Sequence, residues 1–198
     1  MIISIPLIIE MPTILTWWLG DYPPFTVILC QLALIDAMIF SISGPLITGS
    51  MATGRIKIYQ IVVGGLYLLL LPVAFIVLKL GGSPQSTLIV AIVINLITLT
   101  SRVYMLRSMI SLSMKSYCIK VIFPLILITI LSPILPYCIH YSIANNIVRF
   151  LLVCFGTILW TIPIIYFIGA NKEERIKVRQ VAVQYVWPKV KRMLCRKV

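Results

Sequence analysis

The chain has 198 residues, of which 61% are hydrophobic, and its mean hydropathy is +1.08. Soluble domains are about 45–50% apolar, so this composition excludes an ordinary water-soluble fold. The formal net charge is +12, but the basic residues flank apolar segments, as they do in membrane proteins, and we expect no nucleic-acid partner. The five cysteines include no C-x-x-C pair, so we expect no disulfide framework, no metal and no cofactor.

Six apolar segments follow one another, each close to the ~20 residues that a helix needs to cross ~30 Å of hydrocarbon. They are Ile2–Leu19, Phe25–Ile47, Ile58–Leu78, Thr87–Leu106, Val121–Ile139 and Ile147–Gly169. Helices satisfy their backbone hydrogen bonds internally, so the predicted fold is all-α, a polytopic membrane bundle of six transmembrane helices in residues 1–170. Residues 171–198 form a basic tail, which is either an amphipathic helix on the inner leaflet or a disordered extension.

Basic residues are concentrated in alternate connections. They occur between segments two and three, around the loop between segments four and five, and in the tail. The connections Gly20–Pro24, Gly81–Ser86 and His140–Asn146 contain no Lys or Arg. The positive-inside rule therefore predicts that both termini are cytoplasmic. Lys79 and Arg149 lie at segment ends, where we expect them to extend to the headgroups, so no Lys or Arg is expected deep in the apolar region.

Two acidic residues lie deep in the apolar segments, Glu10 in the first and Asp36 in the second. An ionisable group there costs at least ~2.5 kcal/mol and usually faces a bundle interior or a wet cavity. A short loop joins the two segments, so we expect the carboxyl groups at similar depths. They form a proton- or cation-coupling site or a substrate contact; alternatively, each is a protonated carboxyl that hydrogen-bonds to a neighbouring helix. For Asp36 we expect Gln31 or a polar group on such a helix as the partner.

The fourth segment carries a polar face, because Asn95, Thr98 and Arg102 recur at i, i+3 and i+7. This face either lines a passage or hydrogen-bonds to another helix. His140 is the only histidine, and the sequence shows no partners with which it would form a zinc site or a Ser–His–Asp triad. We therefore interpret His140 as an interfacial polar residue and assign no catalytic residue. The candidate coupling or cavity residues are Glu10, Asp36, Asn95 and Arg102.

Prolines interrupt five of the six segments. Each one removes a backbone hydrogen bond and favours a kink, which is typical of helices that bend around a cavity in transporters. The set comprises Pro6, Pro12, Pro45, Pro72, Pro124, Pro133, Pro136 and Pro163.

One stretch resembles a known family. Trp18-Leu19-Gly20, Asp36, Ser43-Gly44-Pro45-Leu46 and above all the run Ala52-Thr53-Gly54-Arg55-Ile56-Lys57-Ile58-Tyr59-Gln60 resemble the bacterial polysaccharide flippases. These O-antigen and lipopolysaccharide biosynthesis transporters belong to the multidrug/oligosaccharidyl-lipid/polysaccharide exporter superfamily. The likeness covers about residues 1–175. Members of that family have about twelve to fourteen spans in two lobes, so the resemblance implies that this chain corresponds to the C-terminal lobe.

The resemblance implies a transport function. The chain is expected to be part of a transporter in the bacterial inner membrane that flips lipid-linked oligosaccharide by alternating access, and not an enzyme. Its expected partners are membrane lipid, the lipid-linked oligosaccharide, and a separate N-terminal lobe or a second copy of the chain. Two alternatives stay open at this stage: a membrane enzyme acting on lipid-linked sugars, and a non-transporting fragment or scaffold.

Overall fold

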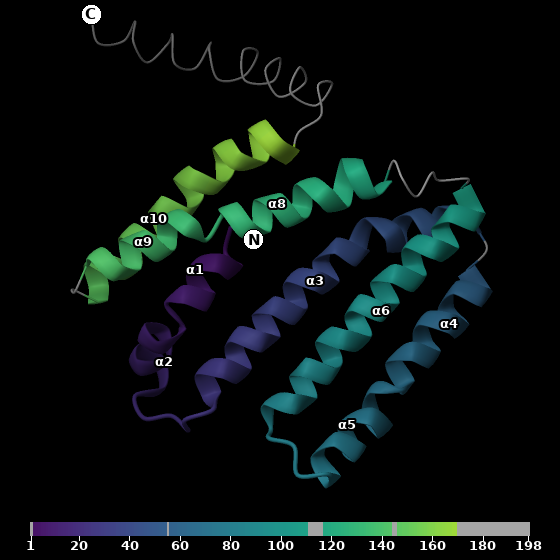
Figure 1. Ribbon diagram of the computed structural model, residues 1–198, viewed down its shortest axis with the longest axis horizontal. Coiled ribbons are helices and arrows are strands. Elements are labelled where there is room, and N and C mark those ends of the chain that lie inside the picture. Colours follow the sequence, from purple (N-terminus) through teal and green to yellow (C-terminus); the bar gives the residue numbers. More distant parts are fainter. Residues whose placement is uncertain (1, 55, 111–116, 144–145, 170–198) are drawn as a thin grey trace, which may run out of the picture.

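The computed structural model describes residues 2–54, 56–110, 117–143 and 146–169, and within these ranges the chain is helical and contains no strand (Figure 1). The predicted all-α class is therefore confirmed. The predicted basic tail, residues 171–198, lies outside the described residues.

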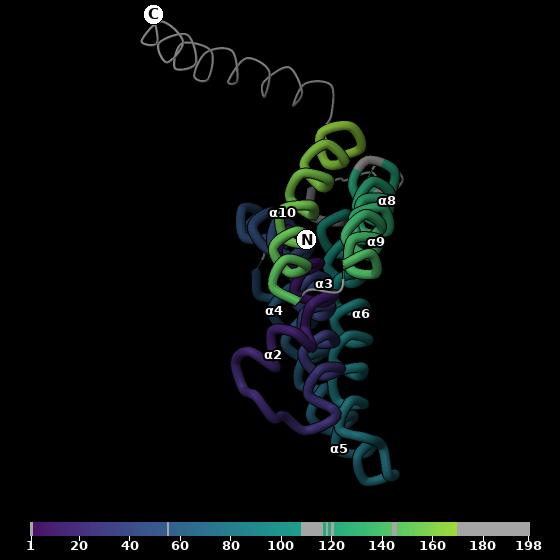
Figure 2. Tube along the Cα trace, turned by 90° about the vertical axis from the view of Figure 1, so that its left-hand side faces the viewer, coloured from purple at the N-terminus to yellow at the C-terminus, as the bar shows by residue number. Residues whose placement is uncertain are grey.

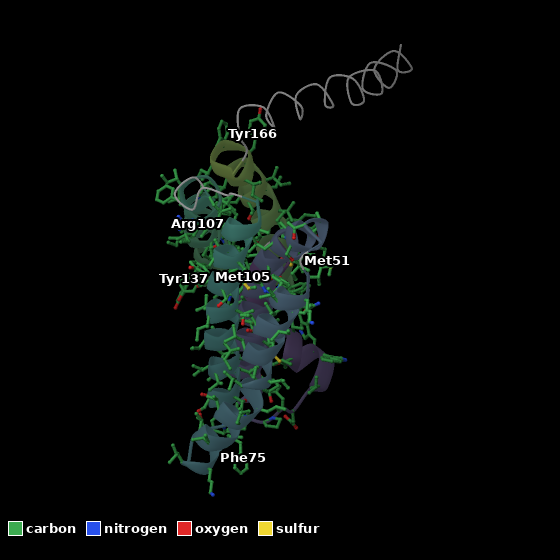
Figure 3. The ribbon with its side chains drawn as sticks, turned by 90° about the vertical axis from the view of Figure 1, so that its right-hand side faces the viewer. Met51, Phe75, Met105, Arg107, Tyr137 and Tyr166 are labelled. Atoms are coloured by element: carbon green, nitrogen blue, oxygen red, sulfur yellow. The ribbon has the colours of Figure 1, made fainter. Side chains whose placement is uncertain are left out.

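Five helical stretches in the described part are long and apolar enough to cross a membrane. They are Thr26–Ala52, Ile56–Lys79, Gln85–Arg107, Phe123–Ser142 and Asn146–Gly169. These stretches match predicted segments two to six. Large apolar side chains cover their outer faces, as a lipid-facing surface requires, and Figure 3 shows Phe75 and Tyr137 pointing outward.

The N-terminal segment is not one continuous helix. It folds as α1 (Ser4–Ile9) and α2 (Met11–Leu19), and the break falls on Glu10, whose φ is −96° and ψ is 17°. At 1.5 Å per residue, α2 is only about 13 Å long, so neither helix crosses a bilayer by itself. The segment Ile2–Leu19, which was expected to be one helix kinked by its prolines, is therefore divided into two short helices at a residue between Pro6 and Pro12.

A side chain from α3 (Thr26–Ala52) compensates for the proline that follows this break. Pro12 has no N–H, so the carbonyl of Ile8, four residues earlier, loses its helical donor. The Gln31 Nε2 atom donates to that carbonyl at 2.9 Å. A backbone group that would otherwise be unsatisfied thus fixes α1 against α3.

Other breaks in the long helices also lie next to prolines. α4 (Ile56–Leu68) and α5 (Leu70–Lys79) separate three residues before Pro72, and α8 (Phe123–Leu131) and α9 (Ile134–Ser142) separate at Pro133. At the second break, the Trp160 indole on α10 (Asn146–Ile164) donates to the Leu131 carbonyl at 3.1 Å. Single π-helical turns, η1 (Cys118–Ile122) and η2 (Ile165–Gly169), precede α8 and follow α10.

The helices form two groups (Figure 1). The first contains α3, α4, α5 and α6 (Gln85–Ile110), in which α3 and α6 run parallel and make the most extensive contact. The second contains α1, α2, α8, α9 and α10. Figure 2 shows α8, α9 and α10 toward one end of the molecule and α5 at the other. α1 packs on α3 as well as on α9 and α10, and α2 also packs on α3, so these two helices connect the second group to the first.

An apolar groove runs along α3 between the two helix groups. It consists of two adjoining hollows of about 280 and 550 Å³, which share Met38 and Ile42 of α3. Ile5 of α1 and Pro133 line the smaller hollow, and Leu106 and Leu125 line the larger one. We call this feature the α3 groove.

We predict that Gln31→Leu destabilises the protein by about 1 kcal/mol, because the Ile8 carbonyl loses its donor. Pro12→Ala restores a backbone N–H at the position that can bond this carbonyl. Gln31→Leu should therefore cost less in the Pro12→Ala background than in the wild type. Unfolding of the purified protein in micelles measures both effects, and an equal cost in the two backgrounds would contradict the assignment.

Candidate functional site

The chain turns at Glu10, between α1 and α2, and two other helices contact this turn. The Glu10 side chain is fully buried there. Its Oε1 atom lies 2.7 Å from His140 Nδ1, near the end of α9. The same oxygen accepts a hydrogen bond from Arg149 Nε, in the first turn of α10, at 3.0 Å. α9 and α10 are consecutive and pack on α1, so their connecting ends deliver both nitrogen groups to one carboxylate.

Thr13 completes the cluster. Its hydroxyl donates to Glu10 Oε2 at 2.7 Å, and Arg149 Nη2 donates to the Thr13 hydroxyl oxygen at 3.0 Å. Glu10 and Thr13 are one helical turn apart, a spacing that places them on the same side of the chain. Both carboxylate oxygens are therefore satisfied. We call Glu10, Thr13, His140 and Arg149 the Glu10 cluster.

The Glu10 cluster can hold or pass a proton. Arginine keeps its charge in proteins, so Arg149 and Glu10 form an ion pair. His140 adds a second positive partner only when it is protonated. Its side chain is 30% exposed, against 17% for Arg149 and none for Glu10. His140 is thus the member of the cluster that is most open to the surface of the bundle.

The Glu10 cluster does not contain an activated nucleophile. A triad needs the hydroxyl hydrogen-bonded to the imidazole. The Thr13 hydroxyl instead donates to the carboxylate of Glu10. No three His, Cys, Asp or Glu side chains gather within the described ranges in a way that would hold a metal ion.

Sequence reasoning identified only Glu10 among the four members of the Glu10 cluster, and missed Thr13, His140 and Arg149. Arg149 was expected to extend to the headgroups, but it turns inward to Glu10. His140 was interpreted as an interfacial residue without partners, but it contacts the same carboxylate. The available signal was the pairing rule: a deep carboxyl needs a partner, and His140 and Arg149 lie near one end of two consecutive segments.

Asp36 belongs to a different cluster from Glu10. Its Oδ1 atom accepts a hydrogen bond from Asn95 Nδ2 on α6 at 2.5 Å, and Asn95 Oδ1 accepts one from the Tyr67 hydroxyl on α4 at 2.7 Å. The partner that Asp36 was expected to have on a neighbouring helix is therefore Asn95, whereas Gln31 donates its hydrogen bond to α1. The two deep carboxyl groups do not share a site.

Arg102 lies further along α6 than Asn95, on the same polar face. It is 3% exposed, and its guanidinium carbon lies 5.7 Å from the centre of the Tyr59 ring on α4. Asn95, Thr98 and Arg102 are all buried, so the polar face of α6 turns into the first helix group. Arg102 is thus enclosed by protein, and Arg149 is directed inward to Glu10.

Comparisons with known proteins give no match to any family model, curated protein or solved structure. The resemblance to the polysaccharide flippases therefore stays a prediction from the sequence.

We predict that Glu10→Gln and Arg149→Gln each destabilise the protein by about 3 kcal/mol, because each leaves a buried partner without its counter-charge. The double variant should lose clearly less than the sum of the two single losses. Lys79→Gln, at an exposed basic residue of α5, is the control and should change stability by no more than about 0.5 kcal/mol. Additive losses in the micelle unfolding assay would disprove the ion pair.

Proposed function

We propose that this chain is part of a membrane transporter that flips a lipid-linked oligosaccharide across the bacterial inner membrane for surface polysaccharide biosynthesis. The observation that carries the proposal is the Glu10 cluster at the break between α1 and α2. Discontinuous helices with an ionisable site in the break are typical of secondary transporters, where they bind coupling ions or charged substrate groups.

The topology in this proposal has six membrane crossings with both ends cytoplasmic. The alternation of basic and neutral connections supports it. α1 and α2 together form the first crossing, and their break is a local interruption in it. In this orientation, His140 and Arg149 lie toward the outer face, at the end of α9 and the start of α10.

The apolar lining of the α3 groove supports the proposal that the substrate is amphiphilic. Its walls are mostly isoleucine, leucine and methionine, and it lies between the two helix groups. A polyprenyl or acyl chain has matching chemistry, while the sugar headgroup needs polar surface elsewhere. In the alternating-access scheme the two helix groups move relative to each other, and the Glu10 cluster links this motion to protonation.

An enzyme acting on lipid-linked sugars is less well supported. Such an enzyme needs a nucleophile, a general base or a metal, and the Glu10 cluster holds its only hydroxyl against a carboxylate. A separate N-terminal lobe or a second copy of the chain is part of the proposal, because a transport cavity between lobes needs a second wall.

Deleting the gene from its own strain should abolish surface polysaccharide and leave the lipid-linked oligosaccharide accumulated on the inner leaflet. The wild-type gene and Lys79→Gln should restore export, and Glu10→Gln should reduce it at least about tenfold if the carboxylate couples transport. Immunoblots confirm equal amounts of each variant in the membrane.

Three outcomes would contradict the proposal. Unchanged surface polysaccharide after deletion would favour a non-transporting fragment. A chemically altered lipid-linked oligosaccharide would favour an enzyme. Labelling of a cysteine placed at Ser83 only from the cytoplasmic side would reject the orientation.

A further inference from the structure

A second buried polar site, independent of the Glu10 cluster, surrounds Arg102 in the first helix group. Its Nε and Nη1 atoms are buried and have no hydrogen-bond partner among the described residues. The Thr98 and Tyr59 hydroxyl oxygens are also buried without a hydrogen-bond partner among the described residues. Thr98 is one helical turn before Arg102 on α6, and the Tyr59 ring lies beneath the guanidinium. We call Arg102, Thr98 and Tyr59 the Arg102 site.

All of these groups can donate a hydrogen bond. The two hydroxyl oxygens can also accept one, but neither of them accepts from Arg102. The guanidinium carbon lies over the Tyr59 ring at 5.7 Å from its centre, and this contact satisfies none of the N–H groups. Buried polar groups in proteins are normally paired, so a buried guanidinium with two unpaired nitrogens, together with two unpaired hydroxyl groups, indicates that an acceptor is missing. The requirement is strict here because the donor carries a full charge.

No described acidic side chain meets this requirement. Glu10 is held by Arg149 and His140 in the second helix group. Asp36 is held by Asn95, which lies seven residues, or about 10 Å along the helix axis, before Arg102. Asp21 precedes the other end of α3, in the connection from α2. The whole sequence has 17 basic residues and five acidic ones, so counter-charges are scarce.

We propose that the Arg102 site binds a small inorganic anion, of the size of chloride. The ligands are Arg102 Nε and Nη1 and the Thr98 and Tyr59 hydroxyl groups. A small ion fits the observations because α3, α4 and α6 enclose the site: Arg102 and Tyr59 are each only 3% exposed. The larger hollow of the α3 groove reaches Leu106, one turn beyond Arg102 on α6.

The test is thermal unfolding of the purified protein in micelles, with sodium chloride exchanged for sodium gluconate at constant ionic strength. Chloride should raise the unfolding midpoint in a saturable way. Arg102→Gln should abolish this rise, and Arg107→Gln, at an exposed arginine of the same helix (Figure 3), should retain it. Constant ionic strength separates binding from general screening.

Thr98→Ala and Tyr59→Phe keep the arginine and each remove one hydroxyl ligand. Each should raise the half-saturating chloride concentration by about three- to tenfold, and they decide the question if Arg102→Gln does not fold. The proposal is wrong if chloride and gluconate give the same midpoint in the wild type, or if Arg102→Gln responds like the wild type. If phosphate raises the unfolding midpoint and chloride does not, the proposal that the ligand is as small as chloride is wrong. None of these outcomes depends on whether the chain transports lipid.

Discussion

The structure depends on the need to neutralise the Glu10 carboxylate inside an apolar bundle. Burying an unpaired charge is strongly unfavourable, and in this chain the compensation comes from the other end of the sequence. Glu10 is 139 residues before Arg149 and 130 before His140. One carboxylate therefore attaches the N-terminal segment to the last two helices of the described chain. α1 and α2, on the two sides of this break, both pack on α3 of the first helix group, and Gln31 fixes α1 to α3.

Polar groups are buried at three places in the bundle. Each buried polar group needs a hydrogen-bond partner, and the three places meet this requirement to different extents. At Glu10 the donors and acceptors balance, and every carboxylate oxygen is bonded. Asp36, Asn95 and Tyr67 form a chain in which each group has a partner. At Arg102, two guanidinium nitrogens have no hydrogen-bond partner among the described residues. Polar contacts of this kind specify which helices pack together in a membrane, where apolar burial alone does not distinguish protein from lipid.

Much of the fold could be predicted from the sequence because hydropathy reports directly on membrane helices. Segments two to six match five long helices within a few residues at most ends. In the first segment the prolines indicated a kink, but the sequence did not show that the helix divides into two at Glu10. The polar face of α6 was also predictable, since Asn95, Thr98 and Arg102 recur with helical spacing.

The partners across the bundle were not predictable in the same way. His140 and Arg149 lie far from Glu10 in sequence, and only the packing of α9 and α10 on α1 brings them together. Periodicity places residues on a face of one helix but does not specify the opposing helix. The general rule that long basic side chains extend to headgroups gave the wrong direction for Arg149, because a buried carboxylate was a closer counter-charge.

The central claim is that Glu10 and Arg149 are in direct contact in the membrane. Solid-state NMR of the protein in lipid bilayers, with ¹³C at the Glu10 carboxyl and ¹⁵N at Arg149 Nε, measures this contact through dipolar recoupling. Strong dephasing, in agreement with the 3.0 Å separation of Nε and Oε1, is the expected result. It should disappear in Glu10→Gln if the ion pair holds the two groups together. Absence of dephasing in the wild-type protein would contradict the account.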